Sequence, residues 1–302
     1  KGSPCTFDDL EGFHDCDADS YFVIEIIFLR ETYMRTYSLA YLTANASPVV
    51  DAVGIAAELG YGYVGLRLMP NGPGAACQSF IDAPTLQRET LAIMADTGVQ
   101  VFDLEIIRIG ETFEHVVYRP LLEAGAALKA RAVLVAADDS DEQRLAQNFA
   151  GLCEFMQPYG LTADLEFMPW TGVKNAEAAL RVVRLAGMPK NAGILVDALH
   201  FGRSTSSLAD IAAIPSELLH YAQMCDAKAG LHFSTEELIQ TARLERQLPG
   251  EGTIDLQGLF DTLPKDLPIS VEIPDMKRSK AMGDKAWSKL ALDATRKVLG
   301  DA

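Results

Sequence analysis

The sequence is poor in cysteine and histidine, which limits the metal and disulfide sites it can form. Its 302 residues include five histidines and five cysteines, Cys5, Cys16, Cys77, Cys153 and Cys225. No two cysteines have C-x-x-C spacing, and an odd, scattered set suits neither a disulfide framework nor a zinc ribbon. We therefore expect a reducing, cytoplasmic setting.

Basic residues and long apolar runs are also scarce. The chain has 26 Lys and Arg against 42 Asp and Glu, a formal net charge of −16. This charge repels a phosphate backbone and argues against nucleic acid as a partner. The densest apolar run near the N-terminus, YFVIEIIFL, contains Glu25 and is too short for a membrane span. We expect a soluble protein without a membrane partner.

Residues 1–33 differ from the rest of the chain in charge. They hold eight acidic and two basic residues, so they carry −6 of the total of −16. Met34 follows, at the start of a more regular pattern. We expect residues 1–33 to be an N-terminal extension, either natural or added upstream, and residues 34–302 to form the folded domain.

Strand-like and helix-like segments alternate from Met34 onward. The expected strands fall within residues 36–42, 61–68, 99–109, 130–137, 161–169, 192–200, 218–227 and 267–274. Segments with helical spacing lie between them, as at 47–60, 83–98, 140–160 and 175–187, often with Ser, Asp or Asn before them and Gly after them. The turn after the first strand, TANASP, lacks the G-x-G-x-x-G pattern, and no Walker-type loop is present. The sequence therefore predicts an α/β fold, a single-domain (β/α)8 TIM barrel.

Polar side chains end the last four predicted strands. They are Glu166, Asp197, Gln223 and Glu272, each in an otherwise apolar stretch. The carboxyl ends of barrel strands form the mouth where reacting groups sit, and unpaired buried charges are costly. Oxygen donors suit one divalent cation, Mn²⁺ or Mg²⁺ with Co²⁺ as a further choice, better than zinc. The competing interpretation is a set of interior salt bridges with Arg67 or Arg108.

This run of motifs resembles the xylose isomerase-like barrel superfamily of sugar isomerases, epimerases and dehydratases. In that superfamily Glu, Asp, His or Gln, and Glu from strands five to eight bind one divalent metal, and the four residues above match that order. The D-x-x-H of DALH implies His200 as a substrate-binding residue. The segment RQLPGEGTIDL implies that Arg246 holds a substrate oxygen. The resemblance covers about residues 34–299.

The expected activity is an isomerase or epimerase acting on a sugar-like hydroxycarbonyl compound such as a ketose or inosose. A cation chelated by the carbonyl and a neighbouring hydroxyl acidifies the C–H between them and stabilises the enediolate that results. The resemblance implies Glu166 and Glu272 as the catalytic base and acid. The motif QMCDA, which begins with Gln223, resembles the corresponding motif of 3-dehydroshikimate dehydratases. A dehydratase that uses the same metal site is therefore the near alternative.

Other polar residues near the expected mouth have two interpretations each. Arg67 and Glu105 contact substrate or form a buried pair that braces the barrel. Lys228 lies just past strand seven, where it could meet a carboxylate or phosphate, whereas Arg203 is expected to be a solvated loop charge. Trp170 is expected to form a wall of the pocket.

Two further hypotheses come from other functional classes. An apurinic endonuclease of the same superfamily needs a His-rich trinuclear zinc cluster and a basic DNA-binding face, which the five histidines and the net charge of −16 oppose. A non-catalytic sugar-binding barrel is the other, because a fold does not guarantee activity. The sequence leaves open whether the chain forms homo-oligomers.

Overall fold

The strands of the computed structural model, which describes residues 35–72, 77 and 80–301, close into a barrel. Each strand pairs in parallel with the next, and β1 also pairs with β8. The strands are β1 Tyr37–Leu39, β2 Tyr63–Leu66, β3 Gln100–Ile109, β4 Ala132–Ala137, β5 Thr162–Glu166, β6 Ala192–Asp197, β7 Ala222–Met224 and β8 Ile269–Val271. All of them fall within the predicted segments, and the predicted TIM barrel is confirmed.

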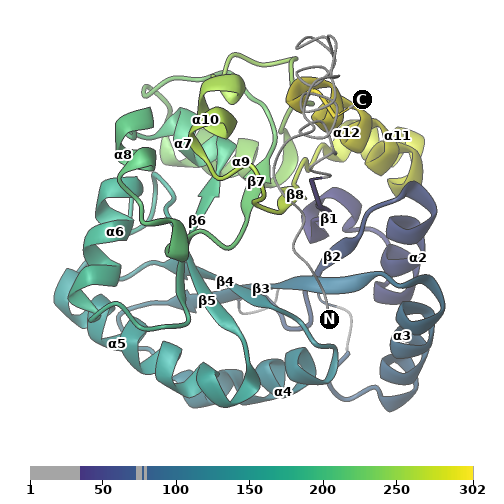
Figure 1. The fold of residues 1–302 in the computed structure, drawn as a ribbon, viewed down its shortest axis with the longest axis horizontal. Coiled ribbons are helices and arrows are strands. Elements are labelled where there is room, and N and C mark those ends of the chain that lie inside the picture. Colours follow the sequence, from purple (N-terminus) through teal and green to yellow (C-terminus); the bar gives the residue numbers. More distant parts are fainter. Residues whose placement is uncertain (1–34, 73–76, 78–79, 302) are drawn as a thin grey trace, which may run out of the picture. The chain divides into compact units, whose positions relative to one another are not determined.

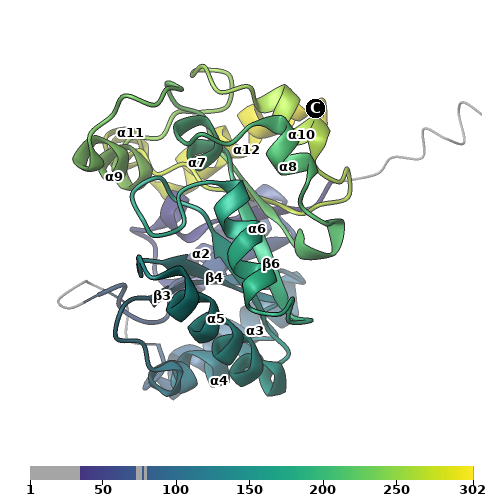
Figure 2. The ribbon, with the colours of Figure 1, turned by 90° about the vertical axis from the view of Figure 1, so that its left-hand side faces the viewer.

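Helices follow the strands and surround them, as Figure 1 shows for α2 to α6. The α-helices are α2 Val49–Leu59, α3 Pro84–Thr97, α4 Arg119–Ala127, α5 Glu142–Met156, α6 Ala176–Leu185, α7 Ala198–Arg203, α8 Leu208–Ala212, α9 Thr235–Leu244, α10 Leu256–Thr262, α11 Met276–Met282 and α12 Asp284–Leu299. The 3-10 turns are η1 Tyr41–Ala44, η2 His115–Tyr118, η3 Gln157–Tyr159 and η4 Ser216–Leu218. In the side view of Figure 2, α6 lies in front of β6.

The capping residues explain most of the predicted helix boundaries. Asp141 accepts hydrogen bonds from the first backbone N–H groups of α5, and Asn175 does the same for α6. Helices α2 and α3 end at Gly60 and Gly98, which have φ of 81° and 77°, a region that favours glycine. Their first turns have no side-chain cap, so the predicted polar starts hold for only part of the set.

Two apolar clusters hold the barrel together. The larger lies between the strands and the helices and includes Leu104, Phe149, Leu165 and Trp287, all essentially inaccessible to water. The smaller includes Phe102, Ala132, Ala136, Leu195 and Tyr221. Because parallel strands covered by helices are buried on both faces, polar residues inside the barrel stand out against this background.

The predicted extension, residues 1–33, lies outside the described residues, so its status stays a prediction. No helix in the described part of the chain is both long and apolar enough to cross a bilayer.

Candidate functional site

A cavity of about 280 Å³ is lined by residues that end or follow several barrel strands. Most of the predicted site residues line it, namely Arg67, Glu105, Glu166, Trp170, His200, Arg246 and Glu272. Glu105 and Arg108 of β3 both line the cavity. The register of β3 against β4 shifts between Leu104 and Ile107, that is, between these two side chains or next to them. The structure therefore brings residues of β3, β5 and α7, and the residues directly after β2 and β8, to one pocket.

The D-x-x-H motif is explained by helix capping. Asp197 is the last residue of β6 and the N-cap of α7, and its Oδ1 accepts a hydrogen bond of 3.0 Å from the backbone N–H of His200. This capping bond fixes His200 in the first turn of α7, so its ring is held beside the end of the neighbouring strand.

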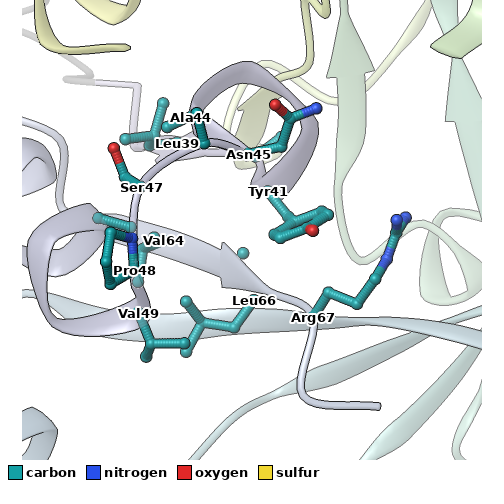
Figure 3. A pocket seen from close by; sticks show the side chains of 14 residues that line it. Leu39, Tyr41, Ala44, Asn45, Ser47, Pro48, Val49, Val64, Leu66 and Arg67 are labelled. Atoms are coloured by element: carbon teal, nitrogen blue, oxygen red, sulfur yellow. The ribbon is translucent and has the colours of Figure 1, made fainter. Parts of the chain in front are cut away.

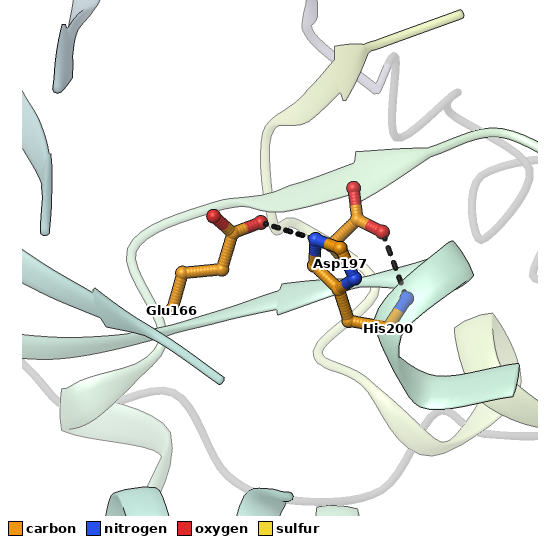
Figure 4. Close-up of side chains that lie close together, drawn as sticks. All are labelled: Glu166, Asp197 and His200. Carbon is orange, nitrogen blue, oxygen red and sulfur yellow. Dashed lines mark hydrogen bonds and ion pairs between the residues drawn. The ribbon is translucent and has the colours of Figure 1, made fainter. Parts of the chain in front are cut away.

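Glu166, at the end of β5, lies next to this capped turn. Its Oε1 is 3.5 Å from Nε2 of His200, and both side chains are buried. Glu166, Asp197 and His200 each offer one ligand atom, and these atoms lie within 4.8 Å of one another (Figure 4). The close cluster thus contains two predicted ligands and the histidine predicted to bind substrate.

Gln223 on β7 lies beside Asp197. The two are paired in the register of β6 and β7, and Gln223 is paired in turn with Ser270 of β8. The Gln223 side chain is completely buried, and neither its oxygen nor its nitrogen has a hydrogen-bond partner among the residues that the structure describes. A buried amide without hydrogen-bond partners is costly, so this side chain is suited to bind a group that the chain itself does not provide.

Arg246 connects Asp197 to the fourth predicted ligand, Glu272. Its Nη1 lies 2.5 Å from Asp197 Oδ2, and its Nη2 lies 2.6 Å from Glu272 Oε2. All three side chains are buried. The competing interpretation expected Arg67 or Arg108 to neutralise the acidic residues at the strand ends. Arg67 pairs instead with Glu105 at 2.8 Å, and Arg108 pairs with Asp138.

Arg67 and Glu105 pair with each other, as one of the two interpretations expects, and both also line the pocket, so their contact with substrate stays a prediction. The Arg67 guanidinium carbon lies 4.4 Å from the centre of the Tyr41 ring. Figure 3 shows these two side chains at a second cavity, of about 270 Å³, between η1 and β2. Arg67 therefore lines both cavities.

Trp170 and Lys228 differ in their relation to the pocket. The Trp170 ring lines the cavity and meets the His200 ring edge to face, with centroids 5.0 Å apart. Lys228 is exposed and is not part of the cavity lining in the described residues. The prediction for Arg203 is wrong: its side chain is buried, and its guanidinium carbon lies 3.5 Å from the centre of the Phe233 ring. A cation over an aromatic face replaces the expected solvation.

Burial controls the protonation of the site. It raises the pKa of Glu166 well above its usual value, and the nearby Asp197 and Glu272 charges add to the effect. Burial also raises the pKa of Glu272 to about 8, although Arg246 opposes the shift. The pKa of His200 falls to about 4, mainly through burial, so its imidazole is neutral near pH 7. Burial would raise the pKa of Asp197, but Arg246 and His200 lower it.

Asp226 is a positioning residue to which sequence reasoning gave no role. Its carboxylate accepts hydrogen bonds from the backbone N–H groups of Ala227, Gly250, Gly252 and Ile254, at 2.8 to 3.3 Å. A Cβ at position 252 would lie 2.2 Å from Asp226 Oδ1, which explains the second glycine of PGEG. The D of QMCDA and the glycines of PGEG were the available signals, but only their contact in space shows that they hold one turn.

The sequence model of the xylose isomerase-like TIM barrel family matches residues 53–298. The chain belongs to this family. No curated protein sequence shows a significant match to this chain.

Solved structures of similar fold agree with membership of the xylose isomerase-like family. The IolI protein, solved with a bound zinc atom, has a TM-score of 0.71 at 17% identity, over 89% of this chain and 99% of that one. The probable 3-DHS dehydratase AsbF of Bacillus anthracis has a TM-score of 0.67 at 15% identity, over 86% and 98%. A D-allulose 3-epimerase from Methylomonas sp., solved with D-allulose, has a TM-score of 0.62 at 15% identity, over 87% and 97%. At these identities the likeness shows the fold.

Proposed function

We propose that the protein is a divalent-metal-dependent isomerase or epimerase of a sugar-like hydroxycarbonyl compound. The observation that carries the proposal is the position of Glu166 and Glu272. Both are buried, both line the same cavity, and both have raised pKa values. A raised pKa makes a carboxylate a stronger base and lets the carboxyl group that results return the proton, which is what acid–base catalysis at a carbon requires.

The residues fit a metal ion on grounds of their own geometry. Glu166, Asp197 and His200 offer ligand atoms within 4.8 Å of one another, and the amide of Gln223 on the adjacent strand is buried without a described partner. We propose Glu166, Asp197, Gln223 and Glu272 as ligands of Mn²⁺ or Mg²⁺, with Co²⁺ as a further choice. The neutral His200 ring adds a nitrogen donor close to this set, which divalent transition metals accept. A cation bound here would polarise a carbonyl and stabilise negative charge on its oxygen.

The chain's own residues would then carry out the proton transfers. Glu166 ends β5, Glu272 directly follows β8, and both line the cavity, so a carbon atom between them could lose a proton to one and gain it from the other. Arg246 holds Glu272 through Nη2, and we assign it the orientation of that carboxylate and of a substrate oxygen. Trp170 presents an apolar face to the C–H surface of the substrate.

A dehydratase of the 3-dehydroshikimate dehydratase type is the second candidate. It is favoured by Gln223, because the amide replaces the histidine expected at this position in many epimerases, and the structurally similar AsbF is a probable 3-DHS dehydratase. The same base would remove the same kind of proton, and loss of a β-hydroxyl would follow instead of reprotonation. The product therefore separates the two candidates, while the residues do not.

The test is solvent deuterium exchange followed by NMR. The full chain with Mn²⁺ would be incubated in D₂O with inososes, ketoses, hydroxypyruvate and 3-dehydroshikimate, and both deuterium incorporation and product would be recorded. Glu272→Gln should lower the exchange rate by roughly 10²- to 10⁴-fold. Glu89→Gln, an exposed change on α3, is the matched control and should leave the rate unchanged. Exchange that survives Glu272→Gln would remove this residue from acid–base catalysis.

A further inference from the structure

The candidate pocket is rich in arginine although the chain as a whole is acidic. Its lining contains the arginines Arg67, Arg108, Arg243 and Arg246 and the glutamates Glu105, Glu166 and Glu272. Counting Asp197 and Asp138, which pair with Arg246 and Arg108, four arginines face five acidic residues before any cation is bound. A divalent cation in the proposed site would leave a surplus of positive charge in a protein of net charge −16.

Three of these arginines already have carboxylate partners. Arg67 pairs with Glu105 at 2.8 Å, and Arg108 makes two hydrogen bonds with Asp138, at 2.7 and 2.5 Å. Arg246 is held between two buried carboxylates. These guanidinium groups are therefore compensated within the chain.

Arg243 is different. It lies in the last turn of α9, its side chain is exposed, and it forms no hydrogen bond or ion pair with any residue of the described part of the chain. Partial burial lowers its pKa, and the positive charges of Arg108 and Arg67 lower it further, whereas the negative charge of Asp138 opposes the shift. The guanidinium groups of Arg67, just after β2, Arg108 of β3 and Arg243 of α9 thus line one pocket, and an anion bound among them would relieve the repulsion that Arg243 experiences.

We propose that Arg243, together with the neighbouring Arg67 and Arg108, binds an anionic head group, carboxylate or phosphate, on the substrate. The inference rests on the proposed function, and it narrows the substrate class from neutral sugars to acidic hydroxycarbonyl compounds. A guanidinium presents two N–H groups to a carboxylate or phosphate, and such charge-assisted pairs are stronger than neutral hydrogen bonds. Arg243 is the specificity-determining member, because among the arginines that line the cavity it is the one that forms no ion pair with a carboxylate of the described residues.

Two matched pairs of compounds test the proposal with the full chain and Mn²⁺, by calorimetric titration. Dihydroxyacetone phosphate and dihydroxyacetone differ only in the phosphate, whereas 3-dehydroshikimate and its methyl ester differ in the charge of the carboxyl group. The anionic member of at least one pair should bind more tightly, and Arg243→Gln should weaken it by roughly tenfold to a hundredfold while leaving the neutral member unchanged. The pair that responds identifies the head group. Arg184→Gln, at an exposed arginine on α6, is the control and should change neither.

The proposal is overturned if the charged and neutral members bind equally, if neither anion binds, or if Arg243→Gln has no selective effect on the anion. Binding does not require turnover, so this result is separable from the exchange experiment. An Arg243-dependent preference for anions without deuterium exchange would contradict the proposed activity and leave the anion site standing. Deuterium exchange on neutral sugars that Arg243→Gln does not alter would support the proposed activity and contradict the anion site.

Discussion

Asp103, on β3, is a carboxyl group buried inside the barrel without compensation. It is 0% exposed, and neither of its oxygens has a hydrogen-bond partner among residues 35–72, 77 and 80–301. The wall beside it is Gly65 of β2, where a Cβ would lie only 2.8 Å from Asp103 Oδ1. Burial raises the pKa of Asp103 to about 7 together with the smaller effects of the Glu272 and Asp164 charges.

This shift predicts how stability changes with pH. Since the folded-state pKa of Asp103 is raised above the usual 3.8, its contribution is fully present below pH 3.8 and is lost as the pH rises to about 7. The interval of about 3 pH units corresponds to about 4 kcal/mol at most, because each unit is about 1.4 kcal/mol. Asp103→Asn keeps the shape and removes the charge, so the variant should be more stable than the natural chain above pH 7, by up to that amount.

Urea unfolding at half-unit steps from pH 4 to pH 9, with a chelator present throughout, measures this difference. The advantage of Asp103→Asn should be small near pH 4 and should grow as the pH approaches 7. Asp96→Asn, at an exposed site on α3, is the control and should show no such trend. If the stability difference between Asp103→Asn and the natural chain stays constant across the range, the carboxyl ionises normally in the folded state and the reasoning is refuted.

Four further substitutions have outcomes that follow from the surroundings of each residue. Gln223→Leu should weaken Mn²⁺ binding, measured by calorimetry, by at least roughly tenfold, because removing even a residue that only supports a metal ligand costs about that much. Unchanged affinity would exclude Gln223 from the set of metal ligands. Gly193→Ala should lower the free energy of unfolding by about 1 to 3 kcal/mol, because its Cβ would lie 2.1 Å from Asp164 Oδ1, whereas Gly151→Ala, with no atom within 4 Å, should raise it by about 0.5 to 1 kcal/mol. Arg246→Leu should cost about 3 to 5 kcal/mol in metal-free urea unfolding at pH 9, above the pKa of Glu272, because two buried carboxylates lose their partner, and a cost near zero would show that these groups are protonated.

The barrel could be predicted from the sequence because its signals are local and repeated. Each strand is a short apolar run, and each of the longest helices has a capping residue or terminal glycine close to where the pattern predicts one, as Asp141 shows for α5. The side chains at the strand ends could be predicted for the same reason: Glu166 and Asp197 are polar residues that end apolar strands. In a closed parallel barrel such ends meet, so position along the chain was enough to place them together.

Partners that come from distant segments could not be predicted in the same way. Nothing local to Arg246 indicates that its guanidinium lies between Asp197 and Glu272, and nothing local to Arg243 distinguishes it from a solvated helix residue. Arg203 shows the opposite case, because a residue expected to be solvated is buried. Its guanidinium lies over the ring of Phe233, which comes from the segment between β7 and α9. Charge pairing depends on the course of the loops, and loop geometry is the part of a barrel that its repeating pattern leaves undetermined.

The position of Arg246 has a consequence for the order in which the protein is assembled. Its guanidinium already neutralises two of the carboxylates that would grip a cation, so the barrel interior is not left with opposed negative charges while the chain folds. Folding and loading can therefore be separate events. An arriving ion would have to draw Asp197 and Glu272 partly away from a resident positive charge, and the affinity of the site for metal becomes the outcome of a competition inside the protein.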